Sequence, residues 1–373
     1  MKKRNLLLSL VILLTFIGGF FVGVLYPTNN SKQFIVKNNP LSTKEYELKE
    51  FPKLKEKVLI GYVQDYRDPN KIPYDKFTHI IFSFAHPSKD GNLLLNGEIA
   101  EKNLKATVTK AHDSNTKVML AIGGWYHIHG GESYAYFKDA ISNVNSRKKL
   151  IREIHNIVEK EKLDGIDIDF EHPRSREDAA NLATFMKELN KTLEKKVLSI
   201  AVSAKVHSIA GTELNNVMYD VNMFEHMDHV NIMAYDGQWD GEYNAANLSP
   251  FEYNENIISY WTKLFDSHKI SREKLVLGIP SYGQPEDPNI KQVSYAAIIE
   301  NHSENAKKDT VQMNGTTYHY NGLATVQKKT DLAMNNGLGG MMLWEVGLDA
   351  RGQNSMTNIL AQQLKKNQLF TLK

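Results

Sequence analysis

The chain has 373 residues, of which 42% are hydrophobic and 24% are charged; these ordinary globular fractions exclude wholesale disorder, a collagen-like chain and a multispanning membrane fold. The 45 basic and 43 acidic residues leave a net charge of +2, which gives no electrostatic support for a nucleic-acid partner. Cysteine is absent, so disulfides, thiol catalysis and cysteine-ligated metal centres are excluded.

The N-terminal segment predicts export from the cytoplasm. A basic cluster at residues 2–4 precedes an uncharged apolar stretch at 6–26, which is closer in length to a membrane-spanning helix than to the apolar core of a cleaved signal. We therefore expect residues 1–26 to be a signal anchor, with a cleaved signal peptide as the alternative. Residues 27–56 are polar and lack a hydrophobic period, which predicts a linker. The remainder is then expected to be extracytoplasmic and held at the membrane by its N-terminal segment.

Eight short runs rich in β-branched and aromatic residues follow the linker, with helical patterns between several of them. Apolar strands that alternate with helices are typical of a parallel sheet covered by helices. Eight such units favour a closed (β/α)8 TIM barrel over residues 57–373, with an open doubly wound sheet as the alternative. The predicted strands span 58–63, 79–85, 117–125, 165–171, 198–204, 229–236, 274–283 and 339–346.

Local signals refine this α/β arrangement. Apolar residues recur with a helical period over 150–158 and 182–193, and Ser175 with Asp178 resembles an acidic capping box before the second of these helices. The longest connection, 281–336, lies between the seventh and eighth strands. It contains Asn314-Gly315 between alternating residues, which predicts a tight hairpin within a small insertion.

The fourth predicted strand carries three carboxylates. Asp167, Asp169 and Glu171 alternate with Ile168 and Phe170, so on a strand the acids share one face and the apolar residues the other. Three ionised carboxylates facing a barrel interior would be costly, so at least one is expected to hold a proton near neutral pH. Glu171 lies at the C-terminal end of its strand, where barrel enzymes place catalytic groups. It is the best candidate for a general acid with a raised pKa.

The acidic strand has two alternative interpretations. An acidic surface strand is disfavoured because the alternation requires burial of one face. A site for Mg²⁺, Ca²⁺ or Mn²⁺ would use the same oxygen donors, but no phosphate-binding glycine loop accompanies them. His127, His129 and His172 are isolated in predicted loops. We therefore predict no metal and no cofactor.

Four segments in strand order resemble one enzyme family. The run DGIDIDFE at 164–171 matches the DxxDxDxE signature of glycoside hydrolase family 18, the chitinase and endo-β-N-acetylglucosaminidase family. AIGGW at 121–125 resembles the SxGG motif of the third strand, and MAYD at 233–236 resembles the MxYD motif of the sixth. Trp344 with Glu345 resembles the end of the eighth. The resemblance covers the chain from residue 58 to the C-terminus.

The resemblance implies a retaining mechanism in which the 2-acetamido oxygen of the substrate replaces an enzyme nucleophile. Glu171 would protonate the glycosidic oxygen and later activate water. Asp169 would hydrogen-bond the acetamido N–H and stabilise the oxazolinium charge, while Asp167 would lie deeper and share a proton with it. Tyr235 would donate its hydroxyl to the acetamido carbonyl.

The resemblance also implies residues that bind the substrate. Trp344 would form the apolar floor under the sugar that is cleaved, and Asp236 would contact the sugar or tune Glu171. For Trp344 and Tyr235, the alternative is ordinary packing in the core. For Trp125 and Trp239, the alternative is a plain surface position. The complete set of implied binding residues is Tyr62, Gly124, Trp125, Met233, Asp236 and Trp344.

One position departs from the family pattern. The serine that begins the family's SxGG motif is replaced by Ala121, so the deep aspartate, Asp167, lacks an expected hydroxyl partner. We expect Ser83, on the second predicted strand, to take its place.

These features predict a glycosidase of β-1,4-linked N-acetylglucosamine polymers, most simply chitin. An endo-β-N-acetylglucosaminidase acting on peptidoglycan or N-glycans keeps the same chemistry, and a non-catalytic sugar-binding protein is the third alternative. Intact Glu171 weighs against the last of these. The expected partner is a polysaccharide or oligosaccharide, and the expected state is a monomer. The short 281–336 connection predicts an open groove and endo-type cleavage.

Overall fold

A computed structural model describes residues 56–204, 218–239 and 241–371. They belong to one compact unit that starts at Lys55. The predicted signal anchor and the linker up to residue 55 lie outside the described residues. Within the described ranges, no helix is both long enough and apolar enough to cross a membrane.

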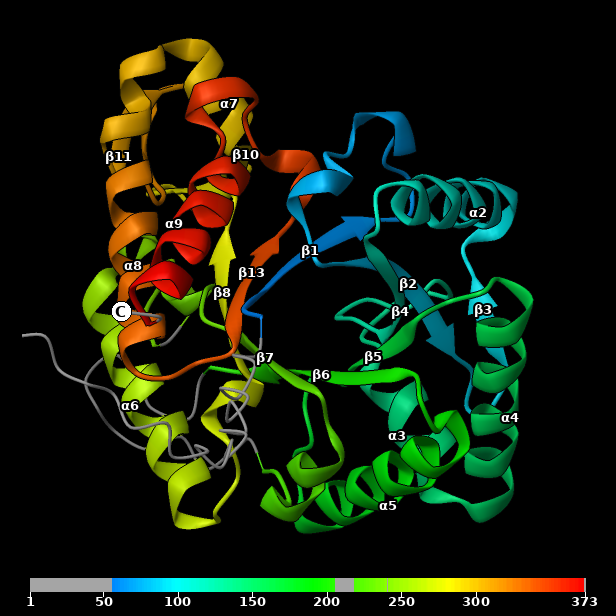
Figure 1. The fold of residues 1–373 in the computed structure, drawn as a ribbon. Helices are drawn as coiled ribbons and strands as arrows, with labels where there is room; N and C mark the ends of the chain where they lie inside the picture. Colours follow the sequence, from blue (N-terminus) through cyan, green and yellow to red (C-terminus); the bar gives the residue numbers. More distant parts are fainter. Residues whose placement is uncertain (1–55, 205–217, 240, 372–373) are drawn as a thin grey trace, which may run out of the picture. The chain divides into compact units, whose positions relative to one another are not determined.

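Eight parallel strands close into a barrel, as the sequence predicts (Figure 1). Closure follows because β1 pairs in parallel with β2 on one side and with β13 on the other. Every predicted strand is present within a few residues of its expected bounds. The barrel strands are β1 (Val58–Gln64), β2 (His79–Pro87), β4 (Lys117–Gly123), β5 (Gly165–Asp169), β6 (Val197–Ser203), β7 (His229–Met233), β8 (Leu275–Pro280) and β13 (Gly340–Trp344).

Helices surround the strands in Figure 1. Both predicted apolar stripes are buried faces, on α4 and on α5. The α5 cap differs slightly from a capping box, because the Ser175 Oγ accepts from the Asp178 N–H at 3.0 Å while the Asp178 carboxylate accepts from the Arg174 N–H at 2.9 Å. The helices are α2 (Gly97–Asp113), α3 (Tyr134–Ser142), α4 (Val144–Lys160), α5 (Arg176–Leu193), α6 (Phe251–Ser267), α8 (Leu323–Asn335) and α9 (Met356–Thr371).

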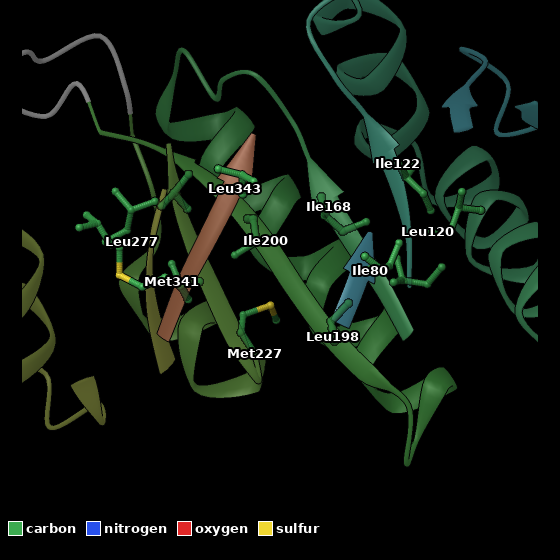
Figure 2. Close-up of a cluster of buried hydrophobic side chains, with 14 of the residues drawn as sticks. Ile80, Leu120, Ile122, Ile168, Leu198, Ile200, Met227, Leu277, Met341 and Leu343 are labelled. Atoms are coloured by element: carbon green, nitrogen blue, oxygen red, sulfur yellow. The ribbon is translucent and has the colours of Figure 1, made fainter. Parts of the chain in front are cut away.

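Alternation along each strand produces two apolar layers. On β5, Ile166 and Ile168 belong to the large cluster between strands and helices, part of which Figure 2 shows with Leu120, Ile122 and Ile200. The opposite faces of the strands fill the barrel interior with a smaller cluster that includes Tyr62, Ala121 and Tyr235. The acids of β5 therefore point into the barrel because their apolar neighbours are buried under the helices.

The 281–336 connection folds as a small α+β insertion. It contains β9 (Tyr282–Pro285), β10 (Val293–Ser294), α7 (Tyr295–Asn301), β11 (Thr310–Met313) and β12 (Thr316–His319). The four strands form an antiparallel sheet. The predicted hairpin joins β11 to β12, with Asn314 and Gly315 both at positive φ, 53° and 78°, as a two-residue turn of this kind requires. The three-residue strand β3 (Leu93–Leu95) was not predicted because it is too short to show a period.

Candidate active site

A cavity of about 830 Å³ lies at the C-terminal ends of the barrel strands. Eight of the predicted site residues line it: Tyr62, Trp125, Asp169, Glu171, Met233, Tyr235, Asp236 and Trp344. Asp167 and Gly124 do not line it. Most of the residues that the sequence singles out on separate strands therefore meet in one place, where barrel enzymes bind their substrates.

Two glycines let the end of β4 approach β5 closely. The Gly124 N–H donates to the carbonyl oxygen of Asp169 at 2.9 Å. A Cβ on Gly123, whose φ is +120°, would lie 2.1 Å from the same oxygen, so no other residue fits there without displacing β5. Gly124, predicted to bind substrate, supports the backbone of Asp169, an acidic residue that lines the cavity.

Asp167 is a fully buried carboxylate with three hydrogen-bond donors. It accepts from the Tyr62 hydroxyl at 2.8 Å, the Ser199 Oγ at 2.5 Å and the Asn231 Nδ2 at 3.1 Å. Burial raises the pKa of Asp167 to about 6, although the three donors act in the opposite direction. Tyr62, predicted to bind substrate, thus uses its hydroxyl to hold the deep aspartate while its ring lines the cavity.

Asp169 lies two residues nearer the cavity than Asp167 and, unlike Asp167, has a carboxylate oxygen that no donor reaches. Its Oδ1 is buried and has no hydrogen-bond partner. Burial, followed by the charges of Glu171 and Asp167, raises the pKa of Asp169 well above its ordinary value. Because donors favour the charged form of a carboxylate and burial without donors favours the neutral form, the negative charge belongs on Asp167 and the proton on Asp169.

Glu171 stands two residues beyond the end of β5 and lines the cavity. Its side chain is 17% exposed, and its Oε2 lies 3.7 Å from the Nε2 of His172, which also lines the cavity. A carboxyl group in this position can reach a bound substrate and exchange protons with water. This geometry suits a general acid and base.

The end of β7 supplies two further polar groups. The Tyr235 hydroxyl donates to the weakly accepting Sδ of Met342 at 3.9 Å, and burial raises its pKa well above its ordinary value, so it remains a donor. Asp236 has a φ of +60°. It accepts from the Tyr282 hydroxyl at 2.6 Å and from the Gln238 Nε2 at 3.1 Å. Tyr282 is the first residue of β9, the first strand of the insertion. The insertion therefore helps to hold the Asp236 side chain in place.

Aromatic rings form the floor and rim of the cavity. Trp344 packs against Tyr62 and Phe84 with ring centroids 5.5 and 5.9 Å away. Trp125 is 42% exposed and Trp239 is 57% exposed, yet both line the cavity. The plain-surface alternative for these two tryptophans is therefore disfavoured, since exposed indoles beside a cleft provide flat faces for ligand rings.

The prediction that Ser83 replaces the family serine as a partner of Asp167 is wrong. The Ser83 Oγ donates at 3.4 Å to the carbonyl oxygen of Ile81. Ala121 is the register neighbour of Asp167 on β4, and Ser199 is its register neighbour on β6. The hydroxyl that donates to Asp167 therefore comes from Ser199 on β6, and β4 supplies none.

Ser199 and Asn231 were not among the predicted site residues, although the sequence carries a usable signal for both. Ser199 alternates with Ile200 in the run 198–204, and Asn231 alternates with Ile232 in 229–236, so each is a polar residue on the inward face of its strand. Tyr282 and Gln238 had no comparable pattern. Among the described residues, no group of three or more acidic or histidine side chains is placed to hold a metal ion.

Comparison with known proteins gives the family. The model of the glycosyl hydrolases family 18 matches residues 58–349. A chitinase-like effector from Moniliophthora perniciosa is 30% identical over 244 residues, which cover 60% of this chain and 53% of that protein. A class V chitinase from Lotus japonicus is 26% identical over 325 residues, or 75% of this chain and 79% of that protein. A family 18 chitinase structure from Flavobacterium johnsoniae superimposes with a TM-score of 0.69 at 25% identity, covering 84% of this chain and 95% of that one.

This chain spans about half the length of the Moniliophthora relatives. The match to the family model nevertheless runs from the first barrel strand to beyond the last, and covers both the acidic strand and the cavity floor. The chain therefore belongs to family 18 of the glycosyl hydrolases.

Proposed function

We propose that this protein hydrolyses β-1,4-linked N-acetylglucosamine polymers of the chitin type, with retention of configuration. The observation that carries the proposal is the row of three acids along β5 and just beyond its end, whose surroundings differ from one acid to the next. Asp167 is buried and holds three donors, Asp169 is buried with an unpartnered oxygen, and Glu171 reaches the cavity. This arrangement supports a proton-transfer role for Glu171 at the cavity, with a proton held on Asp169 and a negative charge on Asp167 deeper in the barrel.

Bond cleavage begins with proton transfer from the Glu171 carboxyl to the glycosidic oxygen. The acetamido oxygen of the same sugar attacks the anomeric carbon as the glycosidic bond breaks, and the leaving sugar departs as a neutral alcohol. The positive charge then resides on the oxazolinium ring. Glu171, now a carboxylate, takes a proton from water as that water attacks the anomeric carbon and opens the ring, so the acid is regenerated.

The remaining polar groups orient the acetamido group. The carboxyl of Asp169 accepts the acetamido N–H, and the Tyr235 hydroxyl donates to the acetamido carbonyl. The negative charge held on Asp167, which is fully buried, stabilises the positive oxazolinium from beneath the cavity in a water-poor site. A glucose polymer lacks the attacking acetamido oxygen and is therefore not a substrate.

The rim suits an extended polymer. Trp125, Tyr126 and Trp239 are exposed aromatic residues that line the cavity, and aromatic faces pack on the apolar faces of pyranose rings. We place the protein outside the cytoplasm, anchored by residues 1–26, on the basis of the charge and length of that segment alone. Its partner there is a polymer that contains N-acetylglucosamine.

The test compares the full chain with its Glu171→Gln variant on chitin oligosaccharides, purified peptidoglycan and N-glycans. Mass spectrometry identifies the new reducing ends. Cuts in chitin oligosaccharides that depend on Glu171 support the proposal. Cuts only in peptidoglycan or N-glycans keep the chemistry but change the substrate.

A protein that binds chitin oligosaccharides with equal affinity in both forms and cuts none of the three is a sugar-binding protein. That outcome overturns the proposal. Measuring the anomeric configuration of the first product by NMR checks retention separately.

A further inference from the structure

The loop between β4 and α3 is a short hairpin that carries two of the rim aromatics. Residues 125–133, here called the aromatic hairpin, are closed by a bridge between Tyr126 and Glu132. Further backbone bonds join His127 N–H to Gly131 O at 3.0 Å and Ser133 N–H to Trp125 O at 2.8 Å. Trp125 and Tyr126 project from its base to line the cavity.

The imidazole of His127 is buried under this hairpin, with only 4% of the residue exposed. Its Nε2 lies 3.1 Å from the carbonyl oxygen of Pro87 at the end of β2. Its Nδ1 lies 3.1 Å from the backbone nitrogen of His129. The ring therefore joins the hairpin to the barrel on one side and closes the hairpin on the other.

These two contacts determine the state of the ring. A carbonyl oxygen can only accept and a backbone N–H can only donate, so the proton must be on Nε2 and Nδ1 must be bare. Burial lowers the pKa of His127 from its ordinary value, in agreement with a neutral ring.

Ring packing extends this anchor toward the cavity floor. The His127 ring stacks on Tyr136 at 3.7 Å with an interplanar angle of 3°. The His127 ring also makes a T-shaped contact with His86, with 5.4 Å between the ring centroids. Phe84 follows at 6.2 Å from His86, and Phe84 also packs on Trp344. A column of rings thus connects the aromatic hairpin with the tryptophan of the cavity floor.

We propose that His127 is a positioning residue that holds Trp125 and Tyr126 at the rim, and that it thereby sets the affinity of the cleft for sugars remote from the bond that is cleaved. This inference rests on the proposed function. His127 does not line the cavity, so it acts through the hairpin and not on the reacting atoms.

Two variants and one control test the proposal in the full chain. His127→Phe keeps a stackable ring but removes both hydrogen bonds. His127→Asn places an amide oxygen near the position of Nδ1, where it can accept from the His129 N–H. The control is His129→Gln, which removes an exposed imidazole of the same hairpin.

The first readout needs no sugar. Amide hydrogen exchange should show the His129 N–H protected in the wild type and in His127→Asn, and unprotected in His127→Phe. The second readout is hydrolysis of N-acetylglucosamine hexamer and of an aryl disaccharide. His127→Phe should raise KM for the hexamer roughly fivefold and leave kcat and the disaccharide reaction unchanged. His127→Asn should recover part of this loss, and His129→Gln should match the wild type.

Unchanged KM for the hexamer in His127→Phe, despite lost amide protection, overturns the inference and leaves the proposed function standing. Equal losses on hexamer and disaccharide also overturn it, because they indicate general damage. If the wild type cuts neither substrate, calorimetric titration with the hexamer replaces KM in the same comparison. A wild type that neither cuts nor binds the hexamer overturns both proposals.

Discussion

Ser199→Ala removes one of the three hydrogen bonds that reach Asp167. The Ser199 Oγ donates to Asp167 at 2.5 Å, and the other two donors, Tyr62 and Asn231, stay in place. The substitution deletes a single buried oxygen from β6. Any change in the titration of the acidic row can therefore be assigned to the loss of that donor.

The expected size follows from the strength of such bonds. A hydrogen bond to a charged group contributes about 1.5–3 kcal/mol, and about 1.4 kcal/mol corresponds to one pKa unit. The pKa of Asp167 is about 6 with all three donors in place. Losing the Ser199 donor removes about 1.5–3 kcal/mol that favours the charged form, so the pKa of Asp167 should rise further and less of the negative charge should reside on Asp167 at neutral pH.

Two assays read this change. The acidic limb of kcat/KM against pH should move upward by about one to two pH units, because the productive form has Asp167 ionised. Infrared titration of aspartate labelled with ¹³C in the carboxyl group, with Asp167→Asn to assign the band, gives the same quantity without any substrate.

The strand register provides a rescue and a control. Ala121 and Ser199 flank Asp167 on β4 and β6, so adding Ala121→Ser to Ser199→Ala should return the acidic limb toward that of the wild type. Ser83→Ala, which removes a buried hydroxyl that contacts Ile81, should leave the limb in place. A Ser199→Ala enzyme whose limb and carboxyl titration both match the wild type would refute this account of the charge on Asp167.

Three further outcomes are expected. Burial raises the pKa of Asp167 from 3.8 to about 6. The carboxyl therefore favours the folded state below pH 4, and this contribution is lost as pH rises through 6. In Asp167→Asn, the free energy of unfolding measured with urea should therefore fall less between pH 4 and 7. Arg67→Met leaves buried Glu345, which also accepts from the Gly347 N–H, without its ion-pair partner, and should cost about 1–3 kcal/mol in the same urea assay. Ser175→Ala removes the cap of α5 and should cost about 1 kcal/mol, which calorimetry would record as a lower Tm; an unchanged Tm would argue against that cap.

The barrel was predictable because its signals are local. Each barrel strand was indicated by a short apolar run, and two of the helices, α4 and α5, by an apolar stripe that the structure buries. Parallel strands connected through helices also fix the order of neighbours around a closed barrel. Within the insertion, only the hairpin at Asn314 and Gly315 had such a signal, because the positive φ of both residues imposes a recognisable turn chemistry.

The hydrogen bonds of the site were harder to predict because they depend on register. Alternation with period two assigns Asp167 and Ser199 to the inward faces of their strands, but it does not say which residues stand opposite one another. A slip of one residue between β5 and β6 would place Leu198 or Ile200 beside Asp167 and turn the hydroxyl away. Contacts across the barrel, such as the one from Tyr62 to Asp167, depend in addition on the tilt of the strands. The acids to which we assign the chemistry can thus be read from a single run of sequence, whereas the donors to Asp167 come from three other strands.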